Sequence, residues 1–118
     1  MKKRLHVVIL LAAFVMVTTN ADASGKPRRT VADLLTSCSK SDGASQSECN
    51  RPIHASIMAE SFMQQPMGAG RTICLPNSPD VAKVRAAILV WLSNKPQLES
   101  VRESDGVTAA LESLYPCS

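Results

Sequence analysis

SPDVAKVRAAILVWLSNKP, residues 78–96, is the stretch that decides the fold. It opens on Ser78-Pro79-Asp80, where a hydroxyl can cap a helix, proline fits the first helical position and an acidic side chain lies in the first turn. Apolar residues then recur at three- and four-residue intervals, the spacing of one helix face: Val81, Val84, Ile88, Trp91 and Leu92. The stretch predicts an amphipathic helix that ends before Pro96, because proline cannot continue it.

A short helix is predicted near the start of the domain. Thr30 and Asp33 have the spacing of a capping box, and Val31, Leu34 and Leu35 follow at helical spacing. The composition of residues 40–45 indicates a turn, so we expect this helix to end around residues 38–41.

A longer helix is predicted next, with Ser45 and Glu48 as its capping box. Its apolar residues are Cys49, Ile53, Ile57 and Phe62. Pro52 leaves two alternatives: the helix starts near Gln46 and kinks at the proline, or it begins at Pro52 itself. We favour the kinked helix because the cap at Ser45 is good, and we expect the helix to stop before Pro66.

The last helix is predicted close to the C-terminus. Ser104 or Asp105 can cap it, and Pro116 ends it. Its apolar stripe is made by Val107, Ala110, Leu111 and Leu114. No stretch of the chain has the sustained alternation of a strand. The predicted fold is therefore all-α, a small disulfide-linked bundle of about four main helices.

The first residues have the pattern of a cleaved signal peptide. Three basic residues at positions 2–4 precede an apolar run, residues 7–17, and Ala21-Asp22-Ala23 offers a cleavage site after Ala23, or alternatively after Ala21. The run is about eleven residues long, whereas a membrane-spanning helix needs roughly 20. We predict a signal peptide over 1–23, a disordered leader over 24–29 and one helical domain over 30–118, exported to the periplasm and free of the membrane after cleavage.

Removal of the signal peptide changes the charge of the protein. The full chain has 13 Lys and Arg against 10 Asp and Glu, a net charge of +3. Without residues 1–23 the net charge is about +1. The basic character belongs mostly to the discarded segment, so nothing in the composition favours binding to nucleic acid.

Four cysteines in an exported chain of this size indicate two disulfides. Three pairings are open; we favour Cys38 with Cys49 and Cys74 with Cys117. A zinc site is not expected, because there is no Cys-x-x-Cys and His54 is the only histidine left after cleavage.

The residues also give no support to an enzyme. His54 has no nucleophile or acidic partner in a known catalytic pattern, and we expect it to be an ordinary surface or half-buried helix residue. Met58 and Met63 lie five residues apart, off one helix face, so copper binding is not expected either. We predict no catalytic activity, no metal and no cofactor.

The stretch from residue 65 to residue 71 is the candidate binding segment. It carries two glycines, an apolar tip and one arginine, a composition that suits a protruding loop, and Met and Arg are enriched at protein interfaces. The candidate partner-binding residues are Gln65, Met67, Gly68, Gly70 and Arg71.

The cysteine frame and the last two helices resemble the Rap/Tai family of immunity proteins against type VI secretion amidase effectors. The resemblance rests on residues 73–76 (Ile-Cys-Leu-Pro), on the helix that follows them, and on residues 114–117 (Leu-Tyr-Pro-Cys), and it spans roughly 31–117. Residues 50–55 depart from the family pattern, which tends to be glycine-rich and to contain aromatics after the second cysteine. The resemblance implies a periplasmic helical protein that binds a peptidoglycan amidase and blocks its active-site cleft, as a dimer.

An alternative from another class is a periplasmic acid-stress chaperone similar to the HdeA family, which is also small, helical and exported. Such a chaperone opens in acid to expose apolar surface. Its members typically have one disulfide, whereas four cysteines here would resist opening.

Overall fold

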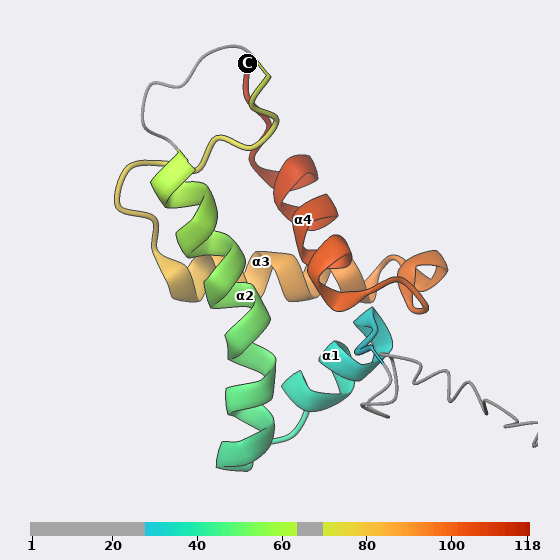
Figure 1. Ribbon diagram of the computed structural model, residues 1–118. Helices are drawn as coiled ribbons and strands as arrows, with labels where there is room; N and C mark the ends of the chain where they lie inside the picture. The colour runs from blue at the N-terminus through green and yellow to red at the C-terminus, as the bar shows by residue number, and fades with distance from the viewer. Residues whose placement is uncertain (1–27, 64–69) are drawn as a thin grey trace, which may run out of the picture.

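The computed structural model describes residues 28–63 and 70–118, and this part of the chain holds four α-helices and no strand (Figure 1). The elements in chain order are α1 (Val31–Cys38), α2 (Gly43–Met63), α3 (Val81–Ser93), a short 3-10 helix η1 (Pro96–Leu98) and α4 (Glu103–Leu114). The all-α fold predicted from the sequence is confirmed, and η1 is the connector before the last helix.

The longest helix, α2, organises the packing. It contacts α1, α3 and α4, and α3 crosses behind it while α4 runs beside it (Figure 1). The predicted apolar stripes converge on one core between these helices, whose buried members are Val31, Leu34, Cys49, Ile53, Ile57, Ile73, Leu75, Val84, Ile88, Leu92, Val107, Ala110 and Leu111. Burial of these side chains is the main force that holds the bundle together.

Phe62 does not join this core, although the sequence grouped it with the apolar residues of the second helix. Its side chain is 73% exposed. Phe62 follows the buried Ile57 by five residues, and five residues turn a helix well away from its starting face.

Thr30 caps α1 as predicted, with both hydrogen bonds of the capping box. The Thr30 hydroxyl accepts from the Asp33 amide at 3.3 Å, and the Thr30 amide donates to the Asp33 carboxylate at 2.9 Å. These bonds satisfy amide groups that the first turn of a helix leaves without partners.

The start of α2 corrects the predicted cap at Ser45 and Glu48. The carboxylate of Asp42 accepts from the Ser45 amide at 2.9 Å, so Ser45 already lies inside the first turn and the helix begins at Gly43. The helix then runs through Pro52 to Met63 without a new start, so the alternative start at Pro52 is wrong, and the predicted start near Gln46 was three residues too late.

The starts of α3 and α4 also differ from prediction. Asp80, rather than Ser78, caps α3 by accepting from the Lys83 amide at 3.2 Å, and Ser78 has a φ of 52° that places it outside the helix. At α4 neither Ser104 nor Asp105 is the cap. The N-cap residue is Arg102, without a side-chain bond, and the Glu103 amide instead donates to the carbonyl of Arg29 at 3.0 Å.

Two disulfides join Cys38 to Cys49 and Cys74 to Cys117, the pairing that the sequence favoured. The first links the last residue of α1 to α2 across 11 residues, with the two Cα atoms 4.9 Å apart. The second spans 43 residues and fixes the segment before α3 to the end of the chain. A long closed loop restricts the unfolded chain more than a short one does.

The predicted signal peptide and most of the predicted leader lie outside the described residues. Arg29, assigned to the leader from the sequence, instead belongs to the packed domain, because its guanidinium contacts two acidic side chains and a serine. No helix in the described ranges is long and apolar enough to cross a membrane.

Candidate binding surface

His54, the histidine weighed as a catalytic residue, is exposed on α2, as predicted for an ordinary helix residue. Over residues 28–63 and 70–118, no three His, Cys, Asp or Glu side chains come together as a group that could hold a metal ion.

Of the predicted binding segment, Gln65, Met67 and Gly68 lie outside the described residues. Gly70 is exposed with a φ of 112°, in the left-handed region that glycine tolerates. Arg71 is half-buried, and its guanidinium donates to the carbonyl of Ile73 at 3.3 Å.

The segment that follows Arg71 is held rigidly against the end of α4. The Cys74 amide donates to the Tyr115 carbonyl at 2.8 Å, and the Cys117 amide donates to the Thr72 carbonyl at 3.3 Å. Two buried side chains, Ile73 and Leu75, anchor the same segment in the core. The disulfide of Cys74 therefore reinforces an arm that backbone bonds and apolar burial already position.

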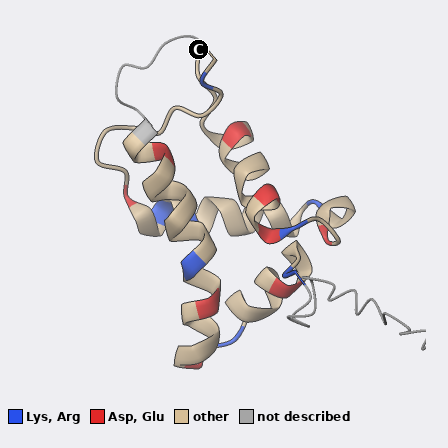
Figure 2. Ribbon diagram, in the orientation of Figure 1, with Lys and Arg blue, Asp and Glu red and all other residues tan. Residues whose placement is uncertain are grey.

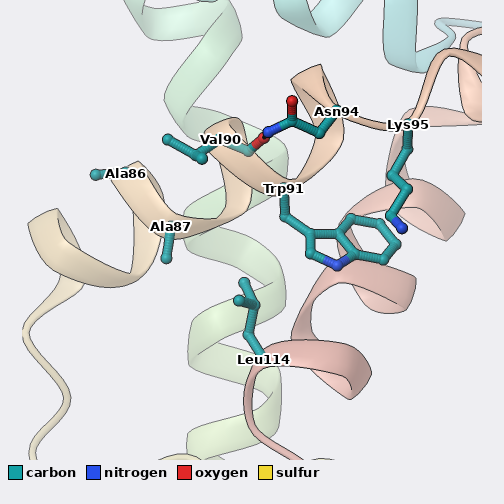
Figure 3. A pocket seen from close by; sticks show the side chains of 7 residues that line it. All are labelled: Ala86, Ala87, Val90, Trp91, Asn94, Lys95 and Leu114. Atoms are coloured by element: carbon teal, nitrogen blue, oxygen red, sulfur yellow. Dashed lines mark hydrogen bonds between the residues drawn. The ribbon is translucent and has the colours of Figure 1, made fainter.

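A shallow apolar groove lies between α3 and the last turn of α4, with a volume of about 530 Å³ (Figure 3). We call it the α3–α4 groove. Its lining residues are Ala86, Ala87, Val90, Trp91, Asn94, Lys95 and Leu114. Val90, in the last turn of α3, is 64% exposed.

The walls of the α3–α4 groove are fixed by polar contacts. The indole N–H of Trp91 donates to the Ser113 hydroxyl at 3.1 Å, which ties α3 to α4. The ammonium of Lys95 lies 5.2 Å from the centroid of the Trp91 ring, within the range of a cation–π interaction. Asn94 donates to the carbonyl of Val90 at 2.9 Å. A surface held in this way loses little side-chain freedom when a partner binds.

The groove was not predicted from the sequence, although the sequence of α3 carries a signal for it. Ala86, Ala87 and Val90 lie off the predicted stripe of residues 78–96, so this helix is apolar over more of its circumference than one core-facing stripe requires. A helix that is apolar on more than one face buries the second face against something else.

A second exposed apolar surface lies on the C-terminal half of α2, where Met58 is 50% and Phe62 73% exposed. The two side chains are four residues apart and so share one face of the helix. We call this surface the α2 stripe. It belongs to a single helix, whereas the α3–α4 groove is built from two.

Two arginines that the sequence analysis did not single out hold the elements together. Arg29 donates to Glu103 at 2.9 Å, to Glu48 at 3.0 Å and to the Ser37 hydroxyl at 3.0 Å, and its hydrogen bond to Glu103 raises the pKa of the Arg29 guanidinium. This network links the chain before α1 to α1, α2 and α4. Stretches of ribbon with basic residues and with acidic residues lie close together where the start of α1 approaches the start of α4 (Figure 2).

The second arginine, Arg85, ties α3 to α2. Its guanidinium donates to the amide oxygens of Asn50 at 2.7 Å and Gln46 at 3.1 Å, and it lies 3.2 Å from the Cys49 sulfur. Arg85 thus occupies the side of α3 that faces α2, and it leaves the opposite side, with the groove, free of arginine.

Among the comparisons with known proteins, one gives a match, and it is to a protein family. No curated protein and no solved structure matched the chain. The family model described as Rap1a immunity proteins matches residues 30–117, which includes all four helices and both disulfides. The resemblance drawn from the cysteine frame is thereby confirmed, and the chain belongs to the family of Rap1a immunity proteins.

Proposed function

We propose that this immunity protein acts in the periplasm, where it binds a peptidoglycan amidase delivered by type VI secretion and occludes the active-site cleft of that enzyme. The observation that carries the proposal is the family match over residues 30–117. The N-terminal signal pattern and the two disulfides support an oxidising compartment outside the cytoplasm.

Occlusion requires a rigid, complementary surface and no catalytic group of the inhibitor's own. The described domain offers such a surface, since two disulfides and the contacts of Arg29 and Arg85 restrict the movement of its elements. Preorganisation of this kind raises affinity because less conformational freedom is lost on binding.

We propose that Gln65, Met67, Gly68, Gly70 and Arg71 contact the amidase, and that the protein binds it as a dimer. Of these, Gly70 and Arg71 are described, and they directly precede the arm that is fixed to the end of α4, which supports a contact role for them. Light scattering of the purified oxidised protein measures the dimer directly; a monomer at micromolar concentration would contradict that part of the proposal.

Titration calorimetry of the mature oxidised protein against amidases encoded beside its gene tests the proposal. We expect a dissociation constant in the nanomolar range, which corresponds to a binding free energy on the order of −12 kcal/mol. If none of these amidases binds the protein, the proposed function is contradicted.

The Arg71→Glu variant tests the predicted segment within the same titrations. Because Arg71 is only half-buried and its one described bond is to the Ile73 carbonyl, we expect a nearly unchanged melting temperature and weaker amidase binding. Intact binding together with a large loss of stability would show that Arg71 is structural.

A further inference from the structure

We infer that the α3–α4 groove binds a segment of the toxin in which apolar side chains are flanked by carboxylates. The inference rests on the proposed function and names the chemistry that the partner must present. Of the two exposed apolar surfaces, the groove is the one with walls from two helices and with its largest side chain fixed by a hydrogen bond.

The apolar requirement follows from the floor of the groove. Ala86 and Ala87 leave space, while Val90, Trp91 and Leu114 form its apolar sides (Figure 3). A partner's apolar side chains would bury the exposed surface of Val90 without displacing the indole, whose N–H is already bonded to Ser113. Aromatic side chains in such central positions contribute a large share of interface energy.

The carboxylate requirement follows from charge. The lining contains one cation, Lys95, and no acidic residue. Lys83 is exposed and precedes Ala87 and Val90 by four and seven residues, so it lies on the same face of α3 at the other end of the groove.

Two acidic side chains of α3 and α4 already accept hydrogen bonds within the protein. Asp80 precedes Lys83 and caps the helix by accepting from its amide. Glu112, on the last turns of α4, accepts from the Thr72 hydroxyl at 3.1 Å. The groove is therefore bracketed by two lysines that a partner's carboxylates can neutralise.

The spacing of the two lysines sets the length of the partner segment. Lys83 lies in the first turn of α3, and the ten residues from there to the last residue of the helix, Ser93, rise about 15 Å; Lys95 follows two residues beyond that end. An extended segment covers about 15 Å or slightly more with five or six residues, so the matching motif is a short apolar run with an acidic residue at each end.

Trp91 allows binding at the groove to be detected directly, because it is the only tryptophan of the chain. Incorporation of 5-fluorotryptophan places a single ¹⁹F resonance in the wall of the groove, and unlabelled amidase is then added to the labelled, oxidised protein. We expect the resonance to shift on complex formation.

Paired variants test the contact. Val90→Asp places a carboxylate at an exposed position of the groove lining, and we expect the amidase to bind about 100-fold more weakly. Ala82→Asp is the matched control: it adds the same charge to an exposed position of the same helix outside the lining, and binding should stay within about 3-fold of the original. Lys83→Glu combined with Lys95→Glu should weaken binding about 10-fold or more at low salt, less so at high salt.

The outcomes separate the two proposals. A calorimetric complex that leaves the ¹⁹F resonance and the Val90→Asp affinity unchanged overturns the groove and leaves the immunity function in place. If no amidase binds, the proposed function fails. Binding at the groove is then tested with a synthetic hexapeptide of four apolar residues between two aspartates. A ¹⁹F shift with this peptide, but not with its lysine-ended counterpart, upholds the chemistry of the groove; no shift with either at millimolar concentration overturns it.

Discussion

Gly106 is the residue on which the contact between α1 and α4 depends. A Cβ at this position would collide with Cγ2 of Val31 and would lie 3.5 Å from Cδ2 of Leu92. Valine is stiff about χ1 and Val31 is fully buried, so its methyl group has little room to move aside. The absence of a side chain at Gly106 thus permits the close approach of the two helices.

Gly106→Ala is expected to lower the free energy of unfolding by about 1–3 kcal/mol, because overpacking outweighs the better helix propensity of alanine. Urea denaturation measures the change. Gly43→Ala is the control: a Cβ there meets nothing within 4 Å, and the variant should be neutral or slightly more stable. Equal stability of the two variants would show that α1 and α4 have room to separate.

For single residues, the core was predicted well from the sequence, and the polar contacts were predicted poorly. Val84, Ile88 and Leu92 are buried as their spacing indicated, because periodicity reports which face of a helix is apolar. Arg29 and Arg85 gave no such signal. The two acidic partners of Arg29 are 19 and 74 residues away in sequence, and the two amide partners of Arg85 are 35 and 39 residues away. Only the packing of the helices brings them together.

At the scale of the elements, the helix starts show what local sequence can and cannot predict. Thr30 was found because its capping box is complete within four residues. The first amide of α4 is satisfied instead by the carbonyl of Arg29, which no local pattern reveals. The errors at Ser45 and Ser78 have a simpler cause: an aspartate nearby, Asp42 or Asp80, provides the cap instead.

Two aspartates at these starts make stability depend on pH. The amide and then the hydroxyl of Thr30 hold the pKa of Asp33 below its ordinary value, and Ser45 does the same for Asp42. A lowered folded-state pKa gives stability that is present above the ordinary value and is lost as the pH falls through the lowered one. We therefore expect the free energy of unfolding to decline below about pH 4.

Urea denaturation between pH 7 and pH 2 checks this expectation, with Asp33→Asn combined with Asp42→Asn as the comparison. The double variant should lose less stability on acidification than the original protein does. If the free energy of unfolding fell equally with pH in both proteins, the two aspartates would not be the source of the pH dependence. The same series tests the chaperone alternative, since a protein that keeps its near-UV circular dichroism at pH 3 does not open in acid.

The two disulfides are expected to differ in their response to mild reductant. Cys74 is exposed, whereas Cys49 is fully buried, so a thiol reaches the C-terminal bond first. Alkylation followed by peptide mass spectrometry should find Cys74 and Cys117 modified before Cys38 and Cys49. Loss of the 43-residue loop should cost about 4 kcal/mol on the chain-entropy model. Simultaneous reduction of both pairs would show that global unfolding controls access.

At the scale of the whole molecule, the helical fold and the family resemblance followed from the sequence, because local patterns and the spacing of the cysteines indicate them. The sequence left three cysteine pairings open, and the structure has the favoured one. The groove did not follow, since it needs Leu114 of one helix beside Val90 and Trp91 of another. Tertiary packing creates such a surface, and an apolar residue destined for a partner looks like one destined for the core.

The most direct measurement of the central claim is inhibition. The oxidised mature protein is titrated into a type VI amidase encoded beside its gene while the release of peptidoglycan fragments is followed. We predict that hydrolysis falls linearly and stops once the immunity protein has saturated the enzyme at a fixed ratio. Undiminished hydrolysis by each such amidase in the presence of excess protein would contradict the account.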